Sequence, residues 1–360
     1  MRIGSTRRFA NVAMALTFSI VVAGCASGSS GSNTTSTSGV KVRTIGYVDI
    51  VAQGAMQKRW YDYFVKSAEK LGWKVKLADA NGDPATALTQ AENFINQHVD
   101  ALAISCIETG SLRAALDDAK AKKIPTMAIG CGMPAPVDAW SGVYAEDDAG
   151  LAKTLAAFMV TKIGAGSEVG ILADAALTVG HIRTDLITSE LKKNGVKVVA
   201  TTVVPLTDIV HGSTVATADI LNGHPNVKAI MCIYDFFAGP AIAAIQQAGK
   251  TSSVDVYSFY ADQVNLPLMI APNSPLKGLV DGPVEQVSLV ALDQLLAYFQ
   301  KGTKIDHDAA ANLKVSFKVF TQADHPAYTQ GYVTPWPLAE YGKPFFDKWN
   351  QAYGLNISAG

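Results

Sequence analysis

Short apolar runs alternate with longer amphipathic segments along most of this 360-residue chain. An apolar run such as residues 44–48 predicts a buried strand, whereas apolar positions that recur every three or four residues predict a helix. Residues 57–71 show the helical pattern, with Trp60 and Phe64 on one face, and Gly72 follows as a stop signal. The chain therefore reads as a regular series of strand and helix units.

The series falls into two halves of similar length. The first half predicts strands at residues 44–48, 74–78, 100–105 and 125–129, and helices at 57–71, 83–97 and 111–122, with Ser111 as an N-cap. After residue 144 the pattern restarts with helices at 147–163, 182–194, 213–222, 239–249 and 284–301, and strands at 168–173, 197–204, 227–233 and 254–259. Repeated units of this kind imply parallel strands with helices on both sheet faces. We predict an α/β fold of two similar Rossmann-like lobes with parallel sheets.

Two facing lobes of this kind predict where a ligand would bind. Open parallel sheets bind ligands beyond the carboxyl ends of their strands. A cleft between the lobes would bring both sets of strand ends around one small molecule, which is the geometry of hinge closure.

The N-terminus has the features of a lipoprotein signal. Arg7 and Arg8 precede an apolar run that starts at Val12, and small residues lead to Cys25. The run is shorter than the roughly 20 residues of a membrane span. We expect a signal peptide at residues 1–24, acylation of the Cys25 thiol, and a protein anchored to the outer face of the cytoplasmic membrane.

The residues after Cys25 predict a tether. Residues 26–39 are almost all Ser, Thr, Gly and Asn, which cannot bury enough apolar surface to fold, so we expect a flexible linker over residues 25–41. The remaining chain is long enough for two domains. Its 30 basic and 31 acidic residues nearly balance, which gives no electrostatic reason to expect nucleic acid as a partner.

Several stretches carry a family resemblance. In the first half they are residues 79–84, 91–105 and 119–127, and in the second half residues 224–231, Asp235 and residues 239–249. Their order and spacing resemble the type I periplasmic binding proteins of the ribose-binding kind, over about residues 44–317. The resemblance implies a solute receptor that passes its ligand to an ABC permease, and we expect the receptor to be a monomer.

The resemblance also implies how the chain is divided. Three crossings between the lobes fall near residues 141–146, 280–284 and 313–317. The first lobe then comprises residues 42–143 and 283–313, the second residues 144–282 and 314–330, and residues 331–360 form an aromatic and proline-rich extension. That extension is too rich in aromatic residues to be disordered. We expect it to pack on a lobe with residues 343–353 helical, and a partner-docking segment is the alternative.

Two candidate ligand residues follow from the resemblance. Arg183 stands where the sugar binders place an arginine, whose several fixed donors suit vicinal hydroxyls. The alternative is a surface arginine paired with Asp185 or Glu190. Asp281 stands at the hinge position of a polar ligand contact, and the alternative there is a plain turn residue.

The sequence also departs from the family pattern. Gly130 and Cys131 stand where the family has an Asp-Arg pair, and Tyr234 and Tyr260 replace an asparagine and an aspartate. The implied pocket is more aromatic and less charged, with phenol hydroxyls taking the place of carboxylate and amide groups. Ribose itself is therefore a doubtful ligand.

Further candidates come from strand ends. Asp49 and Gln57 flank the loop after the first strand, and Asp208 follows a strand of the second lobe, where helix capping is an equal alternative. Cys106 and Cys131 follow strands that should be neighbours, about 5 Å apart, which allows a disulfide. Two small buried thiols remain the alternative.

No catalytic signature accompanies these candidates. The sequence has no Gly-x-Ser-x-Gly elbow, phosphate-binding loop or His/Cys cluster with zinc spacing, so we expect no enzymatic activity, cofactor or metal. The sequence thus predicts a lipid-anchored solute-binding protein that closes around a small neutral sugar or polyol. A ligand-presenting receptor for a sensor, or a binder of a less polar molecule, is the alternative.

Overall fold

The computed structural model describes residues 39–133, 137–327 and 334–358. The predicted signal peptide, the predicted lipidation site Cys25 and most of the predicted tether lie outside these residues. Within the described ranges no helix is long and apolar enough to cross a membrane.

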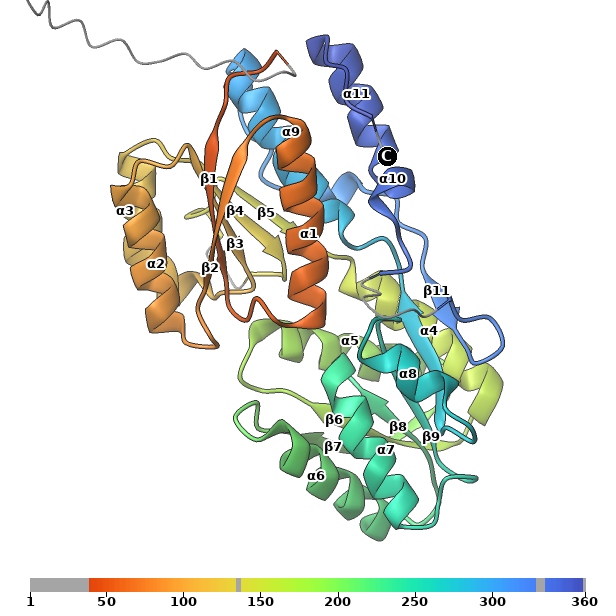
Figure 1. The fold of residues 1–360 in the computed structure, drawn as a ribbon. Coiled ribbons are helices and arrows are strands. Elements are labelled where there is room, and N and C mark those ends of the chain that lie inside the picture. Colours follow the sequence, from red (N-terminus) through yellow and green to blue (C-terminus); the bar gives the residue numbers. More distant parts are fainter. Residues whose placement is uncertain (1–38, 134–136, 328–333, 359–360) are drawn as a thin grey trace, which may run out of the picture. The chain divides into compact units, whose positions relative to one another are not determined.

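Five parallel strands form the sheet of the first lobe, in the order β2-β1-β3-β4-β5 (Figure 1). They are β1 (Thr44–Asp49), β2 (Lys74–Asp79), β3 (Ala101–Ser105), β4 (Thr126–Gly130) and β5 (Gly142–Ala145). Helices α1 (Ala55–Lys70) and α9 (Gln286–Lys301) cover one face, and α2 (Pro84–Asn96) and α3 (Thr109–Ala121) cover the other. All five strands run in one direction, so their carboxyl ends share one edge of the sheet.

Strand β1 shows how the sequence forms these layers. Ile45 and Tyr47 point into the hydrophobic cluster under α1 and α9, whereas Val48 belongs to the cluster under α2 and α3. Gly46 lies directly against Phe94 of α2, and a Cβ atom there would come within 2.6 Å of that ring. A larger residue at position 46 would therefore force α2 away from the sheet.

The second lobe has a sheet of six strands, in the order β11-β10-β9-β8-β6-β7 (Figure 1). They are β6 (Glu168–Ala173), β7 (Lys197–Val203), β8 (Val227–Cys232), β9 (Asp255–Phe259), β10 (Leu276–Asp281) and β11 (Lys318–Phe320), and only β11 is antiparallel to its neighbour. Helices α4 (Asp148–Ile163) and α5 (Thr178–Lys193) pack on one face, and α6 (Ile209–Gly223) and α7 (Ala238–Gln247) on the other, with the short α8 (Asn265–Ile270) after β9. The predicted class of two α/β lobes is confirmed.

The chain passes between the two sheets at three places. Residues 146–147 connect β5 to α4, residues 282–285 connect β10 to α9, and residues 313–317 lead from a short helical turn beside β5 to β11. We refer to these three segments together as the hinge.

The structure corrects some predicted boundaries. Helix α3 begins at Thr109 with Glu108 in the N-cap position, so Ser111 is not the cap. Helix α5 begins at Thr178, one turn before the predicted start at residue 182. Strands β5, β10 and β11 were not predicted, because they have three to six residues and owe their extended conformation to pairing with neighbouring strands.

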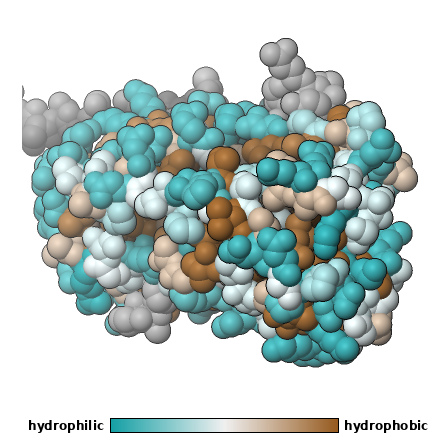
Figure 2. Space-filling view, turned by 90° about the horizontal axis from the view of Figure 1, so that it is seen from below, coloured by the Kyte–Doolittle hydropathy of each residue, from teal (hydrophilic) through white to brown (hydrophobic). Residues whose placement is uncertain are grey.

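The surface is mixed in character. Figure 2 shows polar residues over much of one face, with apolar residues exposed in several places between them. Four of the exposed large apolar residues lie shortly after strands: Val51 after β1, Val210 in the first turn of α6, Phe236 in a short helical turn after β8, and Val264 after β9. Isolated exposed apolar side chains are ordinary, but each of these four follows the carboxyl end of a strand in its lobe.

The C-terminal extension packs on the first lobe. Helix α11 spans Lys343–Tyr353, which confirms the predicted helix, and it lies against α9. Trp349 is buried, and its Nε1 donates to Asp293 Oδ1 of α9 at 2.9 Å. The extension thereby covers an apolar stripe of α9 that would otherwise face solvent.

Replacing Trp349 with alanine should lower the free energy of unfolding by about 3–5 kcal/mol, because it removes a buried aromatic side chain and leaves Asp293 without that donor. The matched control is Lys343→Ala on the same helix, which removes an exposed ion pair with Asp347 and should change stability by less than about 1 kcal/mol. Denaturant unfolding measures both. Equal, small losses would show that the extension adds little to stability.

Candidate ligand-binding site

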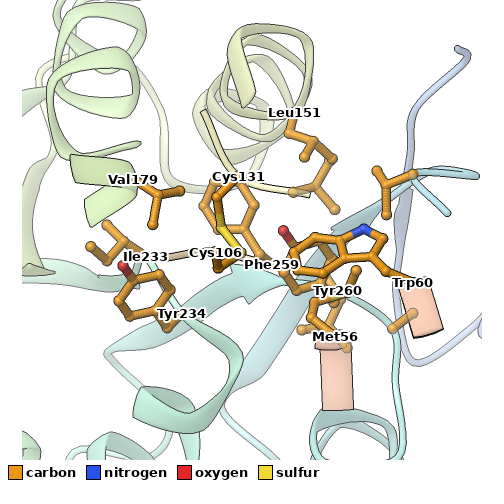
Figure 3. Packing of buried hydrophobic residues seen from close by; sticks show 14 of the residues in the cluster. Met56, Trp60, Cys106, Cys131, Leu151, Val179, Ile233, Tyr234, Phe259 and Tyr260 are labelled. Carbon is orange, nitrogen blue, oxygen red and sulfur yellow. A yellow bond between two sulfur atoms is a disulfide. The ribbon is translucent and has the colours of Figure 1, made fainter. Parts of the chain in front are cut away.

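The two lobes meet at the carboxyl ends of their strands. Glu108 of the first lobe accepts a hydrogen bond through Oε1 from the Thr178 amide of the second lobe at 3.0 Å. Figure 3 shows apolar side chains of both lobes packed together, including Met56 and Trp60 of α1 beside Tyr260, which directly follows β9. The structure therefore describes a closed arrangement of the lobes.

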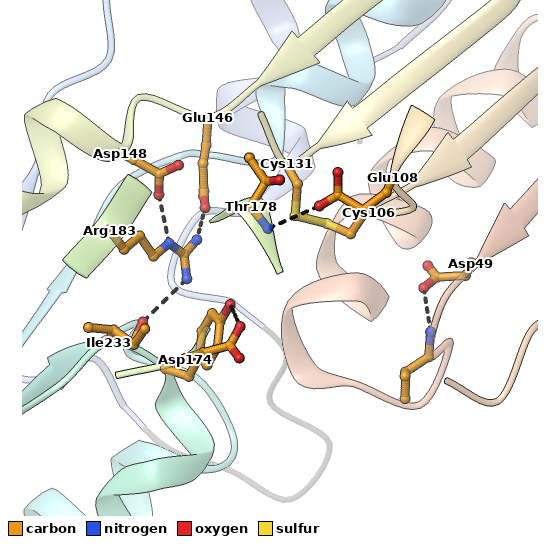
Figure 4. Close-up of a disulfide and its surroundings, with 12 residues drawn as sticks. Asp49, Cys106, Glu108, Cys131, Glu146, Asp148, Asp174, Thr178, Arg183 and Ile233 are labelled. Atoms are coloured by element: carbon orange, nitrogen blue, oxygen red, sulfur yellow. Dashed lines mark hydrogen bonds and ion pairs between the residues drawn. A yellow bond between two sulfur atoms is a disulfide. The ribbon is translucent and has the colours of Figure 1, made fainter. Parts of the chain in front are cut away.

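Arg183 lies buried at the junction, where α5 begins to pass behind the strand ends (Figure 4). Its Nε donates to Asp148 Oδ1 at 2.7 Å, and its Nη2 donates to Glu146 Oε1 and to the Tyr260 hydroxyl. The predicted alternative, a surface pair with Asp185 or Glu190, does not occur. Arg183 instead ties the second lobe to the first crossing of the hinge.

The carboxylates around Arg183 are strongly affected by burial. Burial raises the pKa of Glu146 to about 7, even though the charge of Arg183 lowers it. Burial likewise raises the pKa of Asp148 against the same opposing effect. The Tyr260 hydroxyl donates to Glu146 Oε1 at 2.5 Å, so this phenol completes the set of groups around the guanidinium.

A second buried arginine, Arg59 of α1, was not anticipated from the sequence. Its Nη1 and Nη2 donate to the two oxygens of Asp281, each at 3.0 Å, and its Nε donates to Glu285 Oε1 at 2.7 Å. All three side chains are fully buried. No clear signal in the sequence marks it, because Arg59 stands between Lys58 and Trp60 in a helix of mixed polar and apolar residues.

Asp281 has five hydrogen-bond donors around its two oxygens. Besides the two from Arg59, they are the amides of Ala261 at 2.8 Å and Gly282 at 2.7 Å, and Trp336 Nε1 at 3.1 Å. A carboxylate has about four lone-pair sites, so no acceptor is left for a ligand. The predicted ligand contact at Asp281 is thus not supported by the geometry, which makes this residue an anchor of the hinge.

Tyr260 lies between the two arginines. The Cζ atom of Arg59 is 5.6 Å from the centre of its ring, and that of Arg183 is 5.3 Å away, both within the range of cation–π attraction. Tyr260 also has a φ of +63°, a backbone conformation that few non-glycine residues adopt. The ring thereby separates two positive charges that would otherwise repel each other.

Tyr234 is the other predicted tyrosine of the cleft. It is buried, and its hydroxyl donates to Asp174 Oδ2 at 3.1 Å. Its ring lies beneath the guanidinium of Arg183, with Cζ 5.6 Å from the ring centre. The structure therefore brings Tyr234, Tyr260 and Arg183 together, as the sequence analysis expected.

Asp49 is the last residue of β1 and lies on the side of the junction opposite to Arg183 (Figure 4). Its carboxylate is fully buried, and Oδ1 accepts from the Val51 amide at 3.1 Å, whereas Oδ2 has no hydrogen-bond partner among the described residues. Burial is the main cause that raises the pKa of Asp49 to about 7. The register partner Ser105, at the end of β3, has a buried hydroxyl that acts on the Asp49 carboxylate and lowers its pKa against the effect of burial, although it forms no hydrogen bond of ordinary geometry with the described residues.

The second lobe contributes similar groups that sequence reasoning missed. Asp262 and Asn265 follow β9 and are fully buried. Asp262 Oδ1 accepts from the amides of Val264 and Asn265, but Asp262 Oδ2 and Asn265 Oδ1 have no donor within the described ranges. Their signal in the sequence was only their position beyond a strand end.

Gln57 and Asp208 take little part in the contacts among the buried polar groups of the junction. Gln57 is half-buried, and its amide folds back against Gly54. Asp208 is exposed at the N-cap position of α6 and makes no capping hydrogen bond through its side chain. The structure does not bring Asp208 to the buried groups, and neither of its predicted roles is realised in this conformation.

A disulfide joins Cys106 and Cys131, with 5.0 Å between their Cα atoms (Figure 4). It bridges the ends of β3 and β4, as the expected adjacency of these strands predicts. It lies at the junction of the lobes, where the family resemblance implies an Asp-Arg pair. Cys232 is a free, buried thiol of β8.

A separate pocket of about 560 Å³ opens on the hinge. Residues of all three crossings line it, among them Glu146, Val284 and Leu313. None of the seven predicted ligand residues lines this pocket. Because the hinge segments form the walls of this pocket, its shape must change when the lobes move. The buried polar groups at the strand ends belong to the two lobes themselves, so we regard them as the better ligand site.

Reducing the disulfide should lower the free energy of unfolding by about 3–4 kcal/mol, because the bond closes a loop with a sequence separation of 25 residues. Denaturant unfolding with and without reductant measures this. In the variant with both Cys106→Ala and Cys131→Ala, reductant should have no effect. An equal response of both proteins would contradict the assignment.

Asp49 should make the stability of the unliganded protein depend on pH. Its pKa of about 7 in the folded protein exceeds the ordinary value of 3.8, so the folded state binds the extra proton between these values and loses stability as pH rises. Asp49→Asn should raise stability at pH 8 by about 2–4 kcal/mol and leave it nearly unchanged at pH 4. The control Asp117→Asn removes an exposed carboxylate. A loss of stability in Asp49→Asn at pH 8 would contradict this account.

Comparison with known proteins identifies relatives of this chain. A family model described as the periplasmic binding protein domain matches residues 45–304. A ribose import binding protein of Bacillus subtilis is 29% identical over 190 residues, which cover 51% of this chain and 59% of that protein. A D-xylose-binding periplasmic protein of Escherichia coli is 40% identical over 74 residues, or 20% of this chain and 22% of that protein. Each match thus spans less than two thirds of the relative.

Solved structures share the fold over a larger part of the chain. A 5-methylthioribose transporter solute-binding protein from Thermotoga lettingae has a TM-score of 0.67 at 23% identity, covering 78% of this chain and 86% of that one. An ABC transporter solute-binding protein from Agrobacterium vitis with bound allitol has a TM-score of 0.65 at 22% identity, covering 78% and 96%. With a family model that matches most of the folded residues and a two-lobed fold shared with these structures, the chain belongs to the periplasmic binding protein domain family.

Proposed function

We propose that this protein is the extracytoplasmic solute-binding component of an ABC importer. It closes around one small polyhydroxylated molecule, a sugar or polyol, at the carboxyl ends of the strands of both lobes. The ligand bridges the lobes, and the closed form is the one presented to the permease.

The observation that carries this proposal is the set of buried polar atoms without partners at the junction. Asp49 Oδ2 and Ser105 Oγ belong to the first lobe, and Asp262 Oδ2 and Asn265 Oδ1 to the second. Buried polar groups in proteins are nearly always hydrogen-bonded, since leaving one unpaired costs about 1–3 kcal/mol. A molecule with several hydroxyls supplies the missing partners from both sides at once.

The apolar groups of the junction fit the same ligand. Trp60, the disulfide and Phe259 present apolar surface between the polar groups (Figure 3). Sugars and polyols have apolar C–H faces that pack against such surfaces while their hydroxyls bond to polar groups. This surface also favours a second candidate, a ligand with a larger apolar part.

Similar proteins support the importer role. The Bacillus subtilis relative is named for ribose import, and the Agrobacterium vitis structure holds allitol. The exposed apolar residues Val51, Val210, Phe236 and Val264 follow strand ends, where a permease could contact both lobes. We infer that the protein acts as a monomer, anchored through Cys25 and its Ser/Thr/Gly tether, which raises its effective concentration near the permease.

A ligand screen by thermal unfolding tests the function. Sugars, polyols and small aromatic compounds should be compared, and a ligand at 100 times its Kd adds about 2.7 kcal/mol of stability. We expect at least one sugar or polyol to raise the Tm and no turnover of the bound compound. A response to aromatic compounds alone would overturn the sugar or polyol assignment.

The same screen with Arg183→Gln tests the site. The variant should lose the ligand-induced increase in Tm, because Arg183 aligns Tyr260 and the hinge carboxylate Glu146 at the junction. The matched control is Arg113→Gln, which removes an exposed arginine paired with Asp117 and should keep the full increase. Full retention of the increase in Arg183→Gln would place the ligand elsewhere.

A further inference from the structure

The charge of the junction is strongly unbalanced. Eight buried carboxyl groups lie at the strand ends and in the hinge, namely Asp49, Glu146, Asp148, Asp174, Asp235, Asp262, Asp281 and Glu285. Among the residues that the structure describes, two buried cations face them, Arg59 and Arg183. If all were ionised, eight carboxylates against two guanidiniums would give a formal charge of −6.

The ion pairs account for only half of these carboxyls. Arg183 pairs with Glu146 and Asp148, and Arg59 with Asp281 and Glu285. Asp49, Asp174, Asp235 and Asp262 form no ion pair with any described residue. An unpaired buried carboxylate is costly, so each must be protonated, hydrogen-bonded or matched by a cation from outside the chain.

Asp174 and Asp235 are stabilised by local donors. Asp174 accepts from the amides of Ala176 and Leu177 and from the Tyr234 hydroxyl. The pKa of Asp235 is raised by burial and lowered by the charge of Arg183, by its contacts with backbone amides and by a side-chain contact with Asp262. Asp49 and Asp262 remain, and each has one carboxylate oxygen that forms no hydrogen bond of ordinary geometry in the described ranges.

Asp49 is the more exceptional of the two. The charge of Arg59 acts on Asp262, whereas Asp49 forms no ion pair with a described residue and experiences the like charge of Asp79. The arginine that the family resemblance implies beside this site is replaced by Cys131, which is tied up in the disulfide. The first lobe thus presents a fully buried carboxylate with a free oxygen and no cation.

We propose that the ligand is a polyhydroxylated molecule with a protonated amine, such as an amino sugar or amino polyol, and that its ammonium group binds Asp49. The inference rests on the proposed function and replaces the neutral ligand expected from the sequence. The hydroxyls of the ligand bond to the remaining polar groups, Ser105, Asp262 and Asn265.

An organic cation fits better than a metal ion. No three His, Cys, Asp or Glu side chains of the described chain are grouped closely enough to hold a metal. The free acceptors are instead spread over both lobes, which suits a molecule with one ammonium group and several hydroxyls. Most of the buried atoms at the junction that form no hydrogen bond are acceptors, and in the described part of the chain Trp60 Nε1 is the single one there that can only donate.

Matched series of compounds test the inference. Calorimetry at pH 7 would compare each sugar or polyol with its amino and N-acetylamino counterparts, for example glucose, glucosamine and N-acetylglucosamine, or sorbitol and 1-amino-1-deoxysorbitol. In at least one series the amine should bind about tenfold to a hundredfold more tightly than the hydroxyl parent, since a hydrogen bond to a charged group contributes that much. Acetylation should remove the advantage because it removes the charge.

Variants locate the effect. Asp49→Asn should reduce the preference for the amine at least tenfold while the protein keeps its fold, and the exposed control Asp117→Asn should preserve the preference. Asp262→Asn serves as a second variant on the opposite lobe. It should weaken binding of the amine and of its hydroxyl parent alike, because Asp262 is assigned a hydroxyl of the ligand.

The outcomes separate the two proposals. If hydroxyl parents bind as tightly as their amines in every series, the amine assignment falls and the sugar-binding function stands. An amine preference that survives Asp49→Asn unchanged overturns the role of Asp49. If neither amines nor parents bind, both proposals fail.

Discussion

The burial of charge at the hinge is the constraint on which the rest of the structure depends. Two arginines are held away from water, each between two carboxylates, and the ring of Tyr260 separates them. A buried ion left without its partner costs about 3–5 kcal/mol, so these groups must stay together or become hydrated when the lobes move. Arg59 reaches from α1 to the end of β10, and Arg183 from α5 to the first crossing. The hinge is thus fixed by ion pairs between lobes and crossings.

The predicted fold followed from local signals, whereas the hinge chemistry did not. The periodicity of residues 44–48 and 57–71 marks a strand and a helix whatever their surroundings, and the expected adjacency of two strands suggested a Cys106–Cys131 disulfide, with two buried thiols as the alternative. Arg59 could not be assigned in this way, because its partners lie 222 and 226 residues away. Asp281 was placed correctly at the hinge, but its saturation by five donors depends on α1 and the C-terminal extension meeting there.

Compared with the sugar-binding pattern that the sequence resembles, the cleft has one cation fewer and more apolar surface. The disulfide takes the place of an Asp-Arg pair, which removes one cation and adds apolar surface between the lobes. Buried carboxyls at Asp49 and Asp262 keep oxygens without protein donors. Together these changes describe a ligand with an apolar face and more hydrogen-bond donors than a plain sugar offers. Trp336 of the extension donates to Asp281, so the same cleft is also linked to the part of the chain that departs from the family.

The central claim is that one ligand fills the junction between the strand ends and satisfies buried groups of both lobes. The most direct measurement is a crystal structure of the protein with the compound that stabilises it most. We expect the ligand to lie between Asp49 and Ser105 on one side and Asp262 and Asn265 on the other, with Arg183 still paired to the hinge. A ligand bound in the hinge pocket, or one that contacts a single lobe, would contradict it.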